Sequence, residues 1–287
     1  MSFPEKDFDA PANNSLVDEF GRHHTDLRIS VTDRCNLRCG YCMPLEASFM
    51  SQQRLLTYDE VARCANVASE MGIQTIRLTG GEPLMRPRLD QLIEQLTQLP
   101  KIQEVALTTN GLLLADQAAG LARAGLSRLN VSLDSLDEAR FETIARRSGL
   151  QRILEGLEEA RRQGFRSIRM NAVSIRGLTE QDIVPLAEFC RTHCFHLRFI
   201  EFMPLDAEDA WSREDVLTGR EVRQIIEMHI GELSQIEGNN PGQPSIDYAY
   251  VDGSGVVGFI NPVSQPFCDR CDRLRLTADG QFRNCLF

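Results

Sequence analysis

Short β-prone segments alternate with helical stretches along most of the chain, and this alternation limits what it can fold into. Runs of apolar and β-branched residues lie at 27–32, 75–79, 104–109, 128–133, 167–173 and 197–202. Between them, stretches such as TYDEVARCANVASEMG and RLDQLIEQLTQL carry apolar residues at helical spacing. Strands that alternate with helices in this way build a parallel sheet, either as a barrel or as a doubly wound sheet.

The residues that follow these segments favour the barrel. The segments run into TDRC, TGGEP, TTNG, SLD, NAV and EFMP, so polar or glycine-rich residues stand wherever a strand is expected to end. A barrel gathers such residues at one mouth, whereas a doubly wound sheet concentrates them at a single switch point. The sequence therefore predicts an α/β fold, an incomplete (β/α)6 TIM-like barrel with a small C-terminal extension.

The chain changes character after about residue 235. The stretch GNNPGQPS has the composition of a loop. It leads into YAYVDGSGVVGFI, in which two β-prone runs surround Asp-Gly-Ser-Gly and predict a hairpin. We expect a barrel over residues 20–235 and a separate C-terminal region over residues 236–287.

Composition narrows the class of protein. The 287 residues carry a net charge of −10, which argues against nonspecific binding to nucleic acid, although a pocket can still be locally basic. No run of about eighteen apolar residues occurs and the polar N-terminus resembles no signal peptide, so we expect a cytoplasmic protein without a membrane segment. In a reducing compartment the nine cysteines are more suited to metal binding than to disulfides.

Six of the nine cysteines form two triplets, the first spaced C-x3-C-x2-C directly after a strand and the second spaced C-x2-C-x13-C. They are Cys35, Cys39 and Cys42, and then Cys268, Cys271 and Cys285. Three thiolates can hold three irons of a cubane iron–sulfur cluster and leave the fourth iron open to a ligand. Zinc completed by a distant His or Cys is the alternative. Cys64, Cys190 and Cys194 are available as such ligands, but their helical positions favour packing.

The first spacing, with Tyr41 before its last cysteine, is the signature of the radical S-adenosylmethionine (SAM) superfamily. Further stretches resemble one family within it, the GTP 3′,8-cyclases (MoaA) of molybdenum cofactor biosynthesis. These are SVTDRCNLRCGYCMP, IRLTGGEPLMR, LTTNGLLL, LNVSLDSLD, LRFIEFMPL and FCDRCDRLRLTADGQFRNCLF. The likeness runs from about Arg28 to the last residue. The first triplet marks only the superfamily, whereas the second triplet followed by Arg-Leu-Arg is specific to the cyclases.

The resemblance implies a lyase that holds two [4Fe-4S] clusters, one at each triplet, together with SAM and GTP. The C-terminal extension would then be a cluster-binding one, and no side chain is expected to act as the catalyst, because the radical comes from SAM on the first cluster. The implied SAM contacts are Tyr41, Gly81, Ser132 and Met203. The implied GTP-binding residues are Arg28, Arg77, Thr108, Arg169, Arg273, Leu274 and Arg275. Arginine forks suit phosphates, and glycine lets the backbone approach a ligand closely.

The implied reaction converts GTP to (8S)-3′,8-cyclo-7,8-dihydroguanosine 5′-triphosphate, the first step of molybdenum cofactor biosynthesis. An external electron donor and a homodimer are the implied partners. The sequence departs from the family at position 169, where Arg replaces the usual Lys and keeps the charge but changes its geometry. The sequence also ends at Phe287, before the Gly-Gly tail of the family. We expect cluster and SAM binding, because all six cysteines are present, and complete cyclisation is the step that stays open.

Two other functions remain open. One is radical SAM chemistry on another substrate, such as a peptide, with the second cluster as an electron relay. The other is a protein without full activity that holds zinc or clusters. The arginines behind Cys271 favour a nucleotide over a peptide. Cleavage of SAM that depends on GTP would separate the first alternative from the cyclase, and zinc without iron after anaerobic purification would favour the second.

Overall fold

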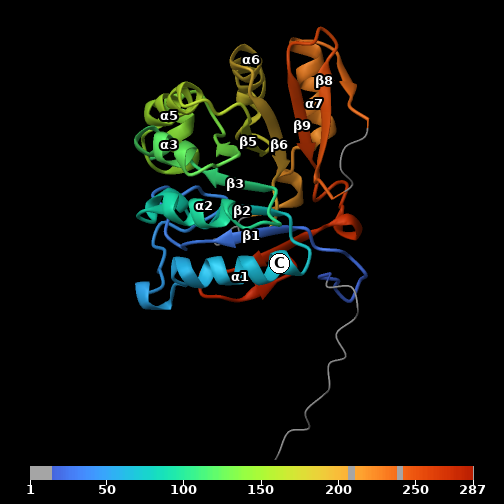
Figure 1. Ribbon diagram of the computed structural model, residues 1–287. Helices are drawn as coiled ribbons and strands as arrows, with labels where there is room; N and C mark the ends of the chain where they lie inside the picture. Colours follow the sequence, from blue (N-terminus) through green and yellow to red (C-terminus); the bar gives the residue numbers. More distant parts are fainter. Residues whose placement is uncertain (1–14, 206–210, 238–241, 287) are drawn as a thin grey trace, which may run out of the picture.

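The computed structural model describes residues 15–205, 211–237 and 242–286, and its centre is one mostly parallel sheet (Figure 1). Six parallel strands follow one another in chain order across this sheet. They are β1 (Asp26–Ser30), β2 (Thr75–Thr79), β3 (Glu104–Thr109), β4 (Arg128–Ser132), β5 (Ile168–Ser174) and β6 (His196–Glu201). Each lies within two residues of a segment predicted from the sequence.

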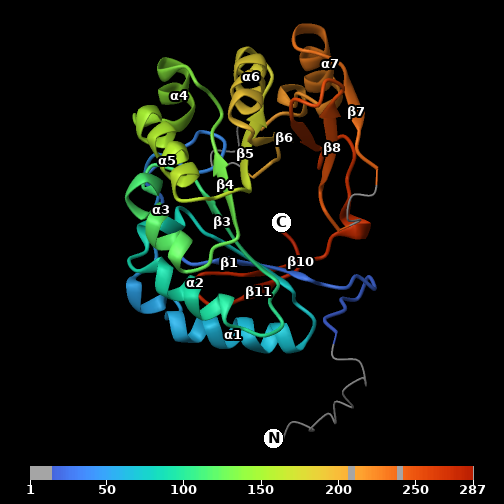
Figure 2. The ribbon, with the colours of Figure 1, turned by 45° about the horizontal axis from the view of Figure 1, so that its top comes forward.

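Helices connect these strands and cover the outer face of the curved sheet (Figure 2). They are α1 (Tyr58–Glu70), α2 (Leu89–Thr97), α3 (Leu114–Arg123), α4 (Glu138–Ala145), α5 (Leu150–Arg162), α6 (Ile183–His193) and α7 (Gly219–His229). Capping boxes begin α1 and α7, in which the hydroxyls of Thr57 and Thr218 accept hydrogen bonds from the amides of Glu60 and Glu221. None of the described helices is both long and apolar enough to cross a membrane.

The strands present different residues to their two faces. In β1 the side chains of Leu27 and Ile29 are fully buried under the helices, while Arg28 between them points to the inner face. The same alternation places Arg77 of β2 on the inner face. Because successive side chains of a strand point to opposite faces, one apolar face packs against helices while the other is free to be polar. The inner face is therefore available for a binding site.

The C-terminal strands extend the sheet at both edges. They are β7 (Leu233–Gln235), β8 (Ser245–Tyr250), β9 (Val256–Ile260), β10 (Arg273–Leu276) and β11 (Phe282–Arg283). The predicted hairpin is β8–β9, and β9 pairs in parallel with β6, whereas β10 pairs in parallel with β1 at the opposite edge. The strand order is β11-β10-β1-β2-β3-β4-β5-β6-β9-β8-β7.

The predicted fold class is confirmed. A mostly parallel α/β sheet forms a partial barrel, and an antiparallel extension follows it at the C-terminal end. The C-terminal segment shares the sheet of the barrel and does not form a sheet of its own. The boundary between residues 235 and 236 stays a prediction.

Candidate functional site

The interior of the partial barrel is hollow. A cavity of ≈ 640 Å³ is lined by alternate residues of β1 to β6 and by the segment that carries the second cysteine triplet. Ser132 ends β4 and lies at the C-terminal mouth, whereas Cys271 precedes β10 and lies at the opposite mouth, because β10 runs parallel to β1. The interior of an ordinary TIM barrel is filled by branched side chains, so a hollow and polar interior indicates a ligand site.

Most of the predicted site residues meet in this cavity. Those that line it are Arg28, Tyr41, Arg77, Thr108, Ser132, Arg169, Met203, Cys268, Cys271, Arg273, Arg275 and Cys285. Those that do not line it are Cys35, Cys39, Cys42, Gly81 and Leu274. The first triplet is represented in the lining by Tyr41 alone. Leu274 packs against the apolar core between two lining arginines, as the alternation of β10 requires. The roles of all these residues stay proposals.

The cavity is strongly basic. Eight arginines line it against four carboxylates, although the whole chain carries a net charge of −10. Three of these arginines, Arg22, Arg128 and Arg198, were not predicted from the sequence. The alternation of side chains along the strands was the sequence signal that could have identified two of them. Arg128 lies two residues before Asn130 and Arg198 two before Ile200, on the same inner face. A local basic field of this kind attracts an anionic ligand.

The arginines of the cavity are crowded and incompletely satisfied. Burial, with the charge of neighbouring arginines, lowers the pKa of Arg128, Arg169 and Arg198 to about 10 in each case. No described residue offers a hydrogen-bond partner to Nε of Arg28, Arg77, Arg128 or Arg198. An unpaired buried N–H is costly, and an anion supplies both acceptors and the missing charge. The arrangement therefore fits a polyanion such as a triphosphate.

Carboxylates form ion pairs with some of these arginines. Glu104 Oε1 lies 2.7 Å from Arg128 Nη1. Asp247 Oδ2 lies 3.5 Å from Arg198 Nη2 and also accepts a hydrogen bond of 3.0 Å from Gln243 Nε2. Asp247 lies outside the cavity lining, so it orients a guanidinium without competing for the ligand. Each pairing limits the directions in which the remaining N–H groups can point.

The first cysteine triplet lies on a tight loop after β1. The amides of Cys42 and Met43 both donate to the carbonyl of Cys39, at 2.9 and 3.0 Å. Burial raises the pKa of the Cys39 thiol, and the charges of Cys42 and Cys35 raise it further, so the three sulfurs lie within electrostatic range of one another. Such thiols stay protonated until a metal replaces the protons.

The donor set of this loop fits an iron–sulfur cluster. Among the described residues, no group of three or more His, Cys, Asp or Glu side chains is placed to hold a single metal ion. A cubane requires less convergence, because each thiolate binds a different iron.

Two glycines at the end of β2 pack directly on the backbone of this loop. A Cβ atom on Gly81 would lie 2.2 Å from the carbonyl oxygen of Arg34, and one on Gly80 would lie 2.3 Å from that of Thr32. Gly81 N also donates to Thr32 O at 2.8 Å. The family resemblance implies that Gly81 contacts SAM. The first requirement of both glycines in the structure is to make room for the chain that leads into the first triplet.

A buried carboxylate ties the ends of β2 and β3 to the same loop. Glu82 is 1% exposed and accepts hydrogen bonds from Thr109 Oγ1 at 2.7 Å, Asn110 N at 2.6 Å and Leu84 N at 2.9 Å. Asn110 Nδ2 in turn donates to Asn36 Oδ1 inside the first triplet at 2.7 Å. Fully satisfied buried networks of this kind make a site rigid.

A second buried carboxylate holds Tyr41 against the end of β4. The Tyr41 hydroxyl donates to Asp134 Oδ2 at 2.6 Å, and Asp134 Oδ1 accepts from Val173 N at 2.8 Å. Burial raises the pKa of Asp134 to about 6, although both hydrogen bonds oppose the shift. Asp134 therefore links the first triplet to β5 and lines the cavity beside Tyr41.

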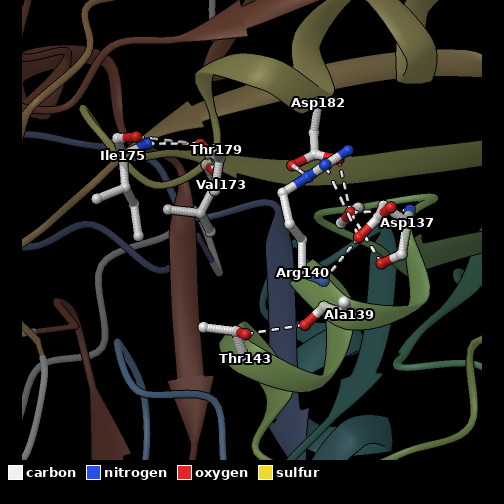
Figure 3. A network of polar contacts seen from close by, with 9 residues as sticks. Asp137, Ala139, Arg140, Thr143, Val173, Ile175, Thr179 and Asp182 are labelled. Carbon is white, nitrogen blue, oxygen red and sulfur yellow. Dashed lines mark hydrogen bonds and ion pairs between the residues drawn. The ribbon is translucent and has the colours of Figure 1, made fainter.

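The segments on either side of Asp134 are themselves anchored (Figure 3). Arg140 of α4, which follows β4, donates from Nε and from Nη2, each at 3.0 Å, to the buried carboxylate of Asp182, which follows β5. After β5, Thr179 Oγ1 accepts from Ile175 N at 2.8 Å and donates to Val173 O at 3.0 Å. The two strand ends that hold Asp134 are thus braced independently of Tyr41.

The raised pKa of Asp134 predicts a pH-dependent stability of the metal-free chain. Its pKa is about 6 when folded and 3.8 in the reference state, so between roughly pH 4 and pH 6 the unfolded chain releases a proton that the folded chain keeps. The free energy of unfolding should therefore fall as the pH rises through this window, by about 3 kcal/mol in total, and this contribution should level off above it.

Asp134→Asn removes this titration. Urea unfolding from pH 4.5 to pH 7.5 should show that the variant gains stability relative to the wild type as the pH rises to about 6. Two stability curves that stay parallel across the range would contradict the prediction.

The second triplet lies at the other mouth, with Cys268 and Cys271 at a short 3-10 turn (Cys268–Arg270) before β10 and Cys285 after β11. Cys271 N donates to Cys268 O at 3.2 Å, and Arg273 Nε donates to Cys271 Sγ at 3.1 Å. Thr25 N donates to the carbonyl of Asp272 at 3.0 Å and fixes the turn against the start of β1. All three cysteines of this triplet line the cavity, so a cluster held there would face a bound ligand directly.

Comparison with known proteins places this architecture in a superfamily. The model of the radical SAM superfamily matches residues 29–190. The crystal structure of Streptococcus suis SuiB bound to S-adenosylmethionine has a TM-score of 0.68 over 92% of this chain and 61% of that chain, at 16% identity. The fold, the cysteine loop and this match define a radical SAM protein.

The C-terminal half identifies the family within it. The model called Molybdenum Cofactor Synthesis C matches residues 195–287. The GTP 3′,8-cyclase of Rhodopirellula baltica is 48% identical over 277 residues, which cover 95% of this chain and 77% of that protein. The GTP 3′,8-cyclase of Mycolicibacterium smegmatis is 44% identical over 97% of this chain and 78% of that protein. The chain belongs to the GTP 3′,8-cyclase family.

Proposed function

We propose that this chain cyclises GTP to (8S)-3′,8-cyclo-7,8-dihydroguanosine 5′-triphosphate in molybdenum cofactor biosynthesis. The observation that carries the proposal is one basic cavity with the second cysteine triplet in its wall at one mouth and Tyr41, from the loop of the first triplet, in its wall at the other. A radical SAM protein needs only the first triplet. The second triplet and the arginines between the two ends supply a place for a nucleoside triphosphate. The related cyclases are named for such a substrate, GTP.

Cys35, Cys39 and Cys42 would hold a [4Fe-4S] cluster beside the SAM site. When bound, the cluster would supply the electron for reductive cleavage of SAM, the chemistry that starts the removal of the 3′ hydrogen of GTP. Tyr41, Ser132 and Met203 lie along the cavity wall at this mouth and contact SAM. Gly81 supports the same site by its close packing on the loop. Asp134 keeps Tyr41 in place through its hydrogen bond of 2.6 Å.

The second triplet and the arginines hold GTP. Cys268, Cys271 and Cys285 would hold a second [4Fe-4S] cluster at the mouth opposite to SAM, where it would face the guanine. Arg28, Arg77, Arg169, Arg273 and Arg275 of the inner face hold the triphosphate, together with Thr108 and the newly found Arg128 and Arg198. Leu274 contributes by its backbone. Holding both ends of the nucleotide sets the ribose before the radical, which is the positioning term of catalysis. The enclosed barrel keeps the radical away from water.

The partners follow from this reaction. GTP is the substrate, and a one-electron donor supplies the reducing equivalents that the chain does not carry. A homodimer and a cytoplasmic location complete the proposal.

An anaerobic assay tests the function. The chain is reconstituted with iron and sulfide and mixed with SAM and dithionite, with or without GTP. We expect 5′-deoxyadenosine and a cyclised nucleotide, both dependent on GTP. Cys271→Ser should abolish the cyclised nucleotide and keep iron at the first triplet. Formation of 5′-deoxyadenosine at a rate that does not depend on GTP, without any cyclised nucleotide, would refute the cyclase assignment, and no SAM cleavage under any condition would refute radical SAM activity.

A further inference from the structure

A small hairpin precedes β1 and reaches the second cysteine triplet. Val17 and His23 form an antiparallel bridge, and Asp18 N donates to Arg22 O at 3.2 Å. Gly21 has a φ of 75° in the turn between them, a conformation that glycine adopts without strain. The hairpin lies outside the βα units from which the barrel was predicted. One of its side chains, Arg22, nevertheless lines the cavity.

Arg22 is held in a single direction by the hairpin. Its Nε donates to Asp18 Oδ2 at 2.7 Å, and its Nη2 lies 2.5 Å from the same oxygen. The two side chains are only 14% and 9% exposed, so this pair is partly shielded from water. The guanidinium also lies 5.2 Å from the centre of the Phe20 ring. A fork fixed on one side presents its remaining N–H groups in one direction.

The remaining nitrogen of the Arg22 guanidinium, Nη1, contacts the second triplet. Arg22 Nη1 donates to the carbonyl oxygen of Cys268 at 3.0 Å, across 246 residues of sequence. The guanidinium therefore lies directly beside the turn that carries Cys268 and Cys271. The backbone bond between Thr25 and Asp272 holds the other end of the same turn.

We infer that Arg22 is a positioning residue for the second cluster. By holding the Cys268 carbonyl it fixes the turn that aims the thiolates of Cys268 and Cys271. Its positive charge also lowers the energy of the reduced, more negative cluster. This inference rests on the proposed function, because the second cluster is part of that proposal. It assigns the N-terminal hairpin a role in the chemistry at the far end of the chain.

Two substitutions separate the two parts of this role. Arg22→Met removes both the hydrogen bonds and the charge, whereas Arg22→Lys keeps the charge and loses the fork. Arg270→Met is the matched control, because Arg270 is an exposed arginine next to Cys271 and the same charge is removed. The full chain is reconstituted anaerobically in each case. The measurements are the rate of iron loss to a chelator and a redox titration followed by electron paramagnetic resonance.

We expect Arg22→Met to lose iron from the second cluster about tenfold faster than the wild type, as the loss of one charge-assisted hydrogen bond implies. Its midpoint potential should become more negative, while that of the first cluster should not move. Arg22→Lys should restore the potential but not the rate of iron loss. Arg270→Met should match the wild type in both measurements.

The outcomes also separate this inference from the proposed function. If Arg22→Met and Arg270→Met behave alike in a chain that carries two clusters, the role of Arg22 is overturned and the proposed function stands. If the wild type binds only one cluster, the second-cluster part of the proposed function fails first. Should Arg22→Met not fold, Arg22→Lys decides the question through its faster iron loss.

Discussion

Gly81→Ala is expected to abolish SAM cleavage almost completely. The new Cβ would lie 2.2 Å from the carbonyl oxygen of Arg34, which is backbone and cannot swing away like a flexible side chain. The loop of the first triplet must therefore shift. A shift of about 1 Å at a reacting centre lowers a rate about a hundredfold, and overpacking lowers the free energy of unfolding by about 1–3 kcal/mol. The readouts are 5′-deoxyadenosine formed per minute and the thermal unfolding midpoint.

Gly231→Ala is the matched control for this substitution. Nothing lies within 4 Å of a Cβ atom added at Gly231, so we expect wild-type cleavage and stability. Iron bound at the first triplet should fall only in Gly81→Ala. Wild-type SAM cleavage by Gly81→Ala would mean that the close packing of β2 on the loop is not required.

Arg198→Met is expected to weaken GTP binding about tenfold to a hundredfold. Arg198 is 4% exposed and lies on the inner face of β6, where its Nε and Nη2 have no hydrogen-bond partner among the described residues. A charge-assisted hydrogen bond to a phosphate contributes about 1.5–3 kcal/mol, which gives this range. Calorimetric titration of GTP measures the dissociation constant. SAM binding at the other mouth should stay within about twofold of the wild type.

The substitution also leaves Asp247 buried without its arginine. Breaking such a pair costs about 3–5 kcal/mol of stability, so a loss of GTP binding could reflect unfolding. The double variant Arg198→Met/Asp247→Asn removes both charges and should recover stability but not GTP affinity. Arg123→Met, an exposed arginine of α3, controls for the loss of one positive charge. Full GTP affinity in the double variant would exclude Arg198 from the binding site.

Local pattern was sufficient to predict the barrel strands, whereas the arginines of the cavity were predicted from the family resemblance. Runs of β-prone residues marked the strands within two residues, because their length and flanking turns are set locally. Arg28 and Arg275 came from family motifs far apart in sequence, and the pairing of β1 with β10 sets them side by side. The structure adds that both side chains point to the polar inner face of the sheet, into the cavity.

The residues that were missed depend on partners from distant segments. Arg198 was within a motif of the family, but its orientation depends on an ion pair with Asp247 on β8. The sequence alone could not show that these two residues pair. Arg22 lies in a polar stretch without periodicity, and only the fold brings it to Cys268. The glycines at 80 and 81 were linked to SAM, whereas their closest neighbours are backbone atoms at 32 and 34. Such contacts are properties of the whole topology.

The pairing of β10 with β1 also has a consequence for how the molecule matures. During synthesis the first triplet leaves the ribosome early, whereas the turn that carries the second triplet docks on Thr25 across 247 residues. Contacts of such long sequence separation form late, because the intervening loop must be closed first. We therefore expect the two sites to become competent for iron at different times. The nucleotide end of the cavity is complete only when the two ends of the barrel sequence have met.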